Sequence, residues 1–111
     1  MPQKITKINH FHATQFAYFL EKLKSIPEGE GTLLDNCMVV YGSGIGDGNA
    51  HNHDNLPVLF AGRGGGNIQT GRHVRYENET PMANLYVSML DKMGVTVDRV
   101  GDSTGKLKEL S

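Results

Sequence analysis

Hydrophobic positions in the first quarter of the chain recur at steps of three and four residues, which is the spacing of one helix face. The set is Ile5, Ile8, Phe11, Phe16, Phe19, Leu20, Leu23 and Ile26. This pattern predicts a long amphipathic helix over residues 5–26, and the polar stretch at residues 9–13 leaves room for a break. Pro27 and Gly29 are expected to end the helix, and the following EGEGT to form a solvated loop.

Two short apolar runs come next, CMVVY at residues 37–41 and VLFAG at residues 58–62. Both are short and rich in β-branched or aromatic residues, so we expect two buried strands. Further on, residues 69–71 have the composition of a turn. The alternation around residues 73–76 predicts a strand or hairpin.

A second helix is predicted to begin at Thr80, as the N-cap, with Pro81 at its first helical position. Gly94 is expected to end it. Residues 95–100 then indicate a short extended segment before a polar tail. The helix carries one apolar stripe, expected to be core or interface, made of Met82, Leu85, Tyr86, Met89, Leu90 and Met93.

This order of elements favours an α/β fold, with a small sheet and two main helices, over a helical bundle. The 111 residues suffice for one domain, 1–111, with a modest core. Ile5 and Ile8 already belong to the first helical pattern, so the chain starts inside an element. We therefore expect a C-terminal fragment of a larger protein.

Composition narrows the functional classes. A net charge of −1 and a hydrophobic fraction of 38% describe an ordinary soluble chain, with no general attraction to nucleic acid or to an anionic membrane. No apolar run approaches the ~20 residues that span a bilayer. The N-terminal MPQKITKINHFH lacks the apolar stretch of a signal peptide, which predicts a cytoplasmic chain as it stands. The single cysteine, Cys37, is expected to be a small buried hydrophobic residue.

The densest candidate chemistry lies on the polar stretch from Ser43 to Asn55, between the two predicted strands. It contains His51, His53, Asp47 and Asp54. Imidazole nitrogens and carboxylate oxygens are the ligands that zinc and similar divalent ions accept, and ends of strands often carry ligand sites. The alternative is a solvated loop whose side chains hydrogen-bond the backbone. Spacing alone leaves both open.

Two further segments are candidates for anion binding. The glycines of GRGGG, residues 62–66, can expose backbone N–H groups to an anion, although a tight connection with positive φ angles is the favoured interpretation. Guanidinium and imidazolium groups also pair with phosphate or sulfate, but a solvated strand face is the simpler explanation for RHVRY. His10 and His12 are expected to be partly buried or capping. The anion-binding candidates are Arg63, Arg72, His73 and Arg75.

Several strings, taken together, resemble the C-terminal part of the HXXSHH family, a group of large proteins named for a histidine-rich motif. They are INHFHATQFAYFLEKLKSIPEGEGTLLDN, VVYGSGIGDGNAHNHDNLPVLFAGRGGG, GRHVRY, TPMANLYVSMLDKMGV and GDSTGKL, and they cover nearly the whole chain. GDGNAHNHDNLP and GDSTG are the most specific. The naming motif itself lies, in the family, just upstream of the segment that matches residues 4–12.

That family is in turn similar to the alkaline phosphatase and sulfatase superfamily. The resemblance implies that CMVVYGSGIG is a strand followed by a metal-binding turn, and that His53 is the later histidine of a two-metal site. The chain departs from the superfamily pattern at Gly44 and Ile45, where a metal carboxylate is expected, and Asp47 is the candidate replacement. The superfamily nucleophile lies near the N-terminus and is not in this chain.

Two functions follow as expectations. In the first, the chain is the C-terminal segment of a metal-dependent phosphate or sulfate ester hydrolase, inactive alone. In the second, it is a non-catalytic binding or self-association module. Apolar helix faces and sheet edges left uncovered predict a homo-oligomer, a dimer, formed through a sheet edge or through the first or the Met-bearing second helix.

Overall fold

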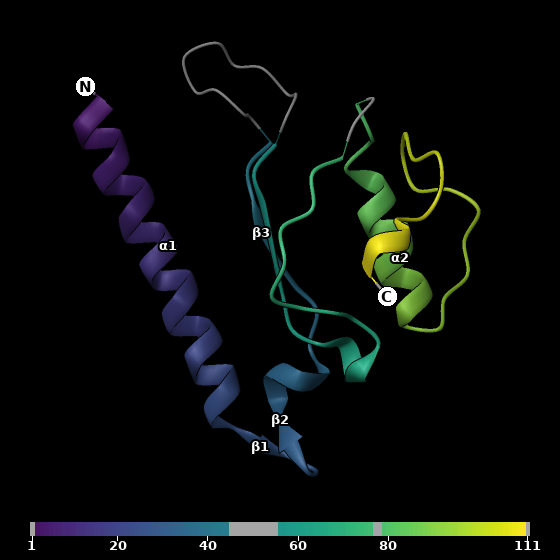
Figure 1. The fold of residues 1–111 in the computed structure, drawn as a ribbon, viewed down its shortest axis with the longest axis horizontal. Coiled ribbons are helices and arrows are strands. Elements are labelled where there is room, and N and C mark those ends of the chain that lie inside the picture. Colours follow the sequence, from purple (N-terminus) through teal and green to yellow (C-terminus); the bar gives the residue numbers. More distant parts are fainter. Residues whose placement is uncertain (1, 45–55, 77–78, 111) are drawn as a thin grey trace.

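The computed structural model describes residues 2–44, 56–76 and 79–110. It is a mixed α/β structure with two helices and two small antiparallel two-stranded sheets. Helix α1 lies on one side, the sheet formed by β3 and β4 lies in the middle, and α2 with the C-terminal segment lies on the other side (Figure 1). The elements are α1 Pro2–Ser25, β1 Pro27–Glu28, β2 Gly31–Thr32, η1 Leu33–Asn36, β3 Val39–Gly42, β4 Val58–Ala61, η2 Gly64–Gly66, α2 Ala83–Lys92 and η3 Lys108–Leu110.

Helix α1 runs without interruption from Pro2 to Ser25, so the break allowed near residues 9–13 is absent. The sequence explains this continuity, because Pro2 stands at the first helical position and no glycine or proline follows within the helix. The hydroxyl of Thr14 donates to the backbone carbonyl of His10 at 2.8 Å, so this polar side chain forms its hydrogen bond within the helix. His10 and His12 are both exposed, contrary to the expected burial or capping.

The segment expected to be a solvated loop after α1 is instead ordered into a small hairpin and a 3-10 turn. Strand β1 pairs antiparallel with β2, and Gly29 makes the turn with a φ of +60°. The 3-10 helix η1 follows at once, and it begins with a capping box between Thr32 and Asp35. The backbone N–H of Thr32 donates to Asp35 Oδ2 at 2.8 Å.

Strands β3 and β4 form the larger sheet, in which Val39 pairs with Ala61 and Gly42 with Val58. The prediction of strands at both apolar runs is confirmed, but the prediction that they are buried is wrong. Most of their residues are half-buried, and Leu59 is 52% exposed. A two-stranded antiparallel sheet covered on part of one face leaves such side chains in contact with water. Cys37, just before β3, is likewise half-buried.

Helix α2 begins at Ala83, two residues after the expected start, and Met82 rather than Thr80 occupies the N-cap position. Its predicted end is correct. Gly94 has a φ of +84°, its N–H donates to the carbonyl of Asp91, and the N–H of Val95 donates to the carbonyl of Leu90 at 2.8 Å. These two bonds form a Schellman motif, which requires a residue with positive φ at this position.

The strand or hairpin expected around residues 73–76 is absent, because residues 72–76 have no regular hydrogen-bonded structure. Residues 95–100, expected to be a short extended segment, also lie outside the strands. The short alternation around residues 73–76 follows an irregular surface path, since only Val74 of those four is half-buried and the others are exposed. A pattern of four residues gives too little burial to select a strand against a loop.

The best-buried part of the described chain surrounds α2. Its apolar residues are Ile68, Ala83, Leu85 and Val87, and the polar side chains of Asn84, Ser88 and Ser103 are equally buried. Of the expected apolar stripe, Leu85 belongs to this core, whereas Tyr86 is 41% and Met93 70% exposed, so for these two the expected interface role stays a prediction. Among the described helices, none is both long and apolar enough to cross a membrane.

Candidate functional site

The histidine-containing stretch connects the two strands of the larger sheet. Strand β3 ends at Gly42 and β4 begins at Val58, and these two residues are register partners. The ends of the connection, residues 43–57, are therefore held side by side at one end of the sheet. The candidate metal ligands His51, His53, Asp47 and Asp54 lie outside the described residues.

The prediction that two strands flank this segment is confirmed, and their pairing is antiparallel, so the segment connects the two strands of a hairpin. Within the described ranges, no three His, Cys, Asp or Glu side chains gather closely enough to hold a metal ion. The described part of the chain supplies no ligand cluster to complement the loop.

Arg63 lies at the opposite end of this sheet from the loop. Arg63 comes two residues after Ala61, which pairs with Val39 at the start of β3. The connection starts at the other end of the sheet, beyond the pair formed by Gly42 and Val58. Three residue steps along a strand span about 10 Å. Arg63 is thus separated from the Gly42–Val58 pair by the length of the sheet.

The glycine-rich segment after β4 uses its backbone donors internally. The N–H of Gly64 donates to the carbonyl of Cys37 at 3.0 Å, and the N–H of Gly66 donates to the carbonyl of Arg63 at 2.8 Å. The N–H of Arg63 points to the carbonyl of Leu34 at 3.4 Å. These donors are already satisfied, so the geometry favours a tight connection over an anion cradle.

The remaining anion candidates are Arg72, His73 and Arg75, all exposed on the irregular segment that precedes α2. Partial burial raises the pKa of the Tyr76 phenol above its ordinary value of 10.0. The carboxylate of Glu109 adds to this rise through its charge and through a side-chain hydrogen bond, and Arg72 opposes it. Arg72 therefore lies within electrostatic reach of the Tyr76 phenol.

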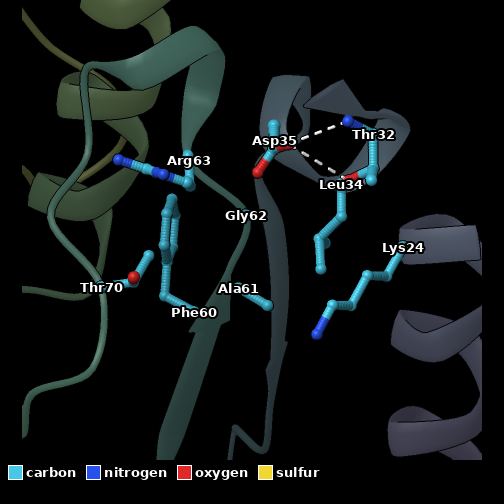
Figure 2. A pocket seen from close by; sticks show the side chains of 9 residues that line it. All are labelled: Lys24, Thr32, Leu34, Asp35, Phe60, Ala61, Gly62, Arg63 and Thr70. Atoms are coloured by element: carbon cyan, nitrogen blue, oxygen red, sulfur yellow. Dashed lines mark hydrogen bonds between the residues drawn. The ribbon is translucent and has the colours of Figure 1, made fainter. Parts of the chain in front are cut away.

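A shallow depression of about 400 Å³ lies between the C-terminal end of α1 and the end of β4 (Figure 2). Lys24 extends from α1 toward the strand that carries Ala61, and Arg63 stands on the far side. The sequence did not indicate Lys24 or this depression, because the lining comes from segments distant in the chain. It is lined by Lys24, Thr32, Leu34, Asp35, Phe60, Ala61, Gly62, Arg63 and Thr70.

The single carboxylate in this depression has a structural role. Asp35 Oδ2 accepts from the backbone N–H of Thr32 at 2.8 Å and lies 3.3 Å from the Thr32 hydroxyl oxygen. A carboxylate used in this way stabilises the first turn of η1 and is a poor candidate for proton transfer. Lys24 and Arg63 leave the depression with a positive rim around an apolar base that includes Phe60.

Comparison with protein-family models, with curated proteins and with solved structures finds no match to this chain. Function therefore has to be argued from the chain itself. Its described part presents two features: the closed base of a loop rich in histidine and aspartate, and a long helix with exposed apolar side chains.

Proposed function

We propose that this chain is an association module, which buries an apolar stripe of α1 against a second copy of itself. The stripe consists of six residues that fall within an arc of about 120° on a helix with 3.6 residues per turn. They are Ile5, Ile8, Phe16, Phe19, Leu20 and Leu23.

The observation that carries the proposal is that only part of this stripe is covered by the chain's own body. Phe16, Leu20 and Leu23 are half-buried, and the Phe16 ring stacks on Tyr41 with 4.8 Å between centroids. Ile5 is 51%, Ile8 54% and Phe19 48% exposed. A helix gains most of its stability in a protein from packing its apolar face. Contact with a second surface would therefore stabilise the half of the stripe that is exposed here.

A neighbouring apolar side chain extends this surface onto the sheet. Leu59 is the register partner of Tyr41, and directly opposed residues of an antiparallel pair project to the same face. Leu59 therefore lies on the face against which Phe16 packs, and it is still 52% exposed. Exposed apolar side chains on both elements support association, since burying the exposed half of each contributes about 1 kcal/mol.

Sedimentation equilibrium tests the proposal over a range of protein concentrations. We expect a monomer–dimer equilibrium that Ile8→Ser shifts toward monomer. Tyr18→Ser is the matched control, because Tyr18 is 57% exposed but lies on the opposite side of α1 from the stripe. A wild-type monomer at every concentration, or equal effects of both substitutions, would contradict the proposal.

The second candidate function is that of a metal-ligand segment of a phosphate or sulfate ester hydrolase. The His and Asp content of residues 43–55 favours it, as does the resemblance to the HXXSHH family. In that assignment the chain corresponds to the C-terminal portion of an alkaline-phosphatase-like fold, and His51, His53, Asp47 and Asp54 bind zinc or a similar divalent ion. The paired ends Gly42 and Val58 support it by restraining the base of the loop.

Metal analysis of the purified chain tests this candidate separately from association. We expect bound divalent metal in the wild-type protein and its loss in the His51→Ala, His53→Ala double variant. His10→Ala, His12→Ala is the control, because it removes the same number of imidazoles, both exposed on α1 and outside the loop. Metal at background in the wild-type chain would contradict a metal site formed by this segment alone.

A further inference from the structure

The depression between α1 and the end of β4 is held in shape by contacts among the segments that line it. The N–H of Arg63 points to the carbonyl of Leu34 at 3.4 Å, and the same carbonyl accepts from the N–H of Cys37 at 3.1 Å. Gly62 is buried with a φ of +96°, and a Cβ there would overlap the carbonyl of Cys37. The end of β4 therefore packs directly on the segment that follows η1. A surface built in this way is preorganised, which lowers the cost of binding a ligand.

The base of the depression is apolar and contains an aromatic ring. Leu34, Phe60 and Ala61 line it, and all three are half-buried. The volume of about 400 Å³ falls within the range of about 300–1,000 Å³ that small-molecule sites have. An aromatic group of a ligand can pack on the Phe60 ring by offset stacking or edge-to-face contact.

Two cations border this apolar base. Lys24 reaches it from the last turn of α1, and Arg63 stands on the far side, on the segment after β4 (Figure 2). Within the described part of the chain, Lys106 pairs with Asp91 at 3.5 Å, whereas neither Lys24 nor Arg63 pairs with a carboxylate. Both charges are therefore available to an anionic ligand. The sequence indicated Arg63 as an anion-binding candidate, and the structure adds Lys24.

The carboxylate of Asp35 offsets only one of these two charges. Its Oδ2 accepts from the backbone N–H of Thr32 at 2.8 Å, and a Cβ at Gly31 would overlap it. The carboxylate is thus turned toward β2, where it stabilises the start of η1. Two positive groups and one negative group line the depression, so its net charge is positive.

We infer that this depression binds a small organic acid that joins an aromatic ring to a carboxylate. The ring packs on Phe60, and the carboxylate lies between Lys24 and Arg63. A guanidinium pairs with a carboxylate through two parallel N–H···O bonds, whereas an ammonium acts as a point charge, so Arg63 contributes more than Lys24. The inference does not rest on self-association, because no residue of the α1 stripe lines the depression.

Nuclear magnetic resonance of the full chain titrated with 2-naphthoate tests the inference. We expect a dissociation constant of about 1 mM or tighter, with shifts of the backbone amides of residues 32–35 and 60–63. The amide 2-naphthamide has the same ring without the charge, and inorganic phosphate has charge without the ring. Each is expected to bind at least about tenfold more weakly than 2-naphthoate.

Substitutions of the two cations locate the bound carboxylate. Arg63→Gln is expected to weaken the binding of 2-naphthoate about tenfold and Lys24→Gln about threefold, while Arg63→Lys should fall between wild type and Arg63→Gln. Arg75→Gln and Lys7→Gln are the matched controls, because they remove exposed cations outside the depression. Far-ultraviolet circular dichroism of each variant checks that the fold is retained.

The outcomes either support the inference or overturn it. Absence of 2-naphthoate binding by the wild-type chain overturns it, and so does equal binding of 2-naphthamide or of phosphate. Equal losses in the cation variants and in their controls would assign binding to the overall charge of the chain, and would overturn it as well. None of these results bears on the proposed function, which sedimentation of the wild-type chain without ligand tests by itself.

Discussion

The side chain of Asn84 is joined to Thr104 by two hydrogen bonds. Asn84 Oδ1 accepts from the backbone N–H of Thr104 at 2.8 Å, and Asn84 Nδ2 donates to the Thr104 hydroxyl at 3.1 Å. One turn later, the hydroxyl of Ser88 accepts from the backbone N–H of Leu107 at 2.7 Å. Helix α2 thus holds the GDSTGKL segment through polar side chains, while most of the segment stays exposed and only its Ser103 is buried.

Asn84→Ala is expected to lower the free energy of unfolding by about 1–3 kcal/mol. The substitution leaves the N–H of Thr104 without its acceptor in a region where the Asn84 side chain is only 5% exposed. Urea denaturation followed by circular dichroism measures the change. Asn67→Ala, which removes a weaker exposed bond to Gly64 at 3.4 Å, is expected to change stability by less than about 0.5 kcal/mol. Equal losses in both variants would contradict this account.

Gly62→Ala is expected to destabilise the protein more than Gly66→Ala does. Both glycines have a φ of +96°, so both substitutions carry a similar backbone cost of about 1 kcal/mol. A Cβ on Gly62 would overlap the carbonyl of Cys37, whereas a Cβ on Gly66 would meet open space. Steric displacement should add about 1–3 kcal/mol at Gly62. Thermal unfolding of the two variants measures the difference, and equal melting temperatures would count against the close approach.

The interaction between Tyr76 and Glu109 predicts a loss of stability at high pH. Partial burial and the neighbouring carboxylate raise the pKa of the folded-state Tyr76 phenol above 10.0. The folded state therefore binds the phenolic proton more tightly than the unfolded state. This contribution is complete below about pH 9 and is lost as the pH rises through 10 and above.

Melting temperatures of wild type and Tyr76→Phe, measured between pH 8 and 11, test this prediction. The wild-type melting temperature should fall more steeply above pH 10 than that of the variant, and Glu109→Gln should reduce the difference. Parallel curves for wild type and Tyr76→Phe would show that the phenol titrates alike in both states.

Local signals in the sequence located the regular elements well, and their boundaries less well. The repeat from Ile5 to Leu23 predicts α1, because one helix face is apolar over about five turns. Gly94 predicts the end of α2, because a Schellman motif requires a positive φ. The β1–β2 hairpin was missed, since two residues per strand are too few to show a period.

The buried polar contacts and the candidate site depended on tertiary structure. Asn84 and Ser88 resemble ordinary surface residues of a helix, and only their partners some twenty positions later explain their burial. Likewise, the antiparallel pairing of β3 with β4 places Arg63 at the end of the sheet away from the Gly42–Val58 pair. The sequence shows which residues carry candidate charges, but only the direction of β3 and β4 shows which of them lie at the same end of the sheet.

The pairing of Gly42 with Val58 has a consequence for engineering this chain. Because the sheet itself holds the two ends together, the cost of closing the connection depends only weakly on its length. Each doubling of a flexible connection costs about 0.6 kcal/mol of closure entropy. The connection is therefore a site at which an added peptide or reporter domain should be accepted with little loss of stability, while the same addition within the GDSTGKL segment should break its hydrogen bonds to Asn84 and Ser88.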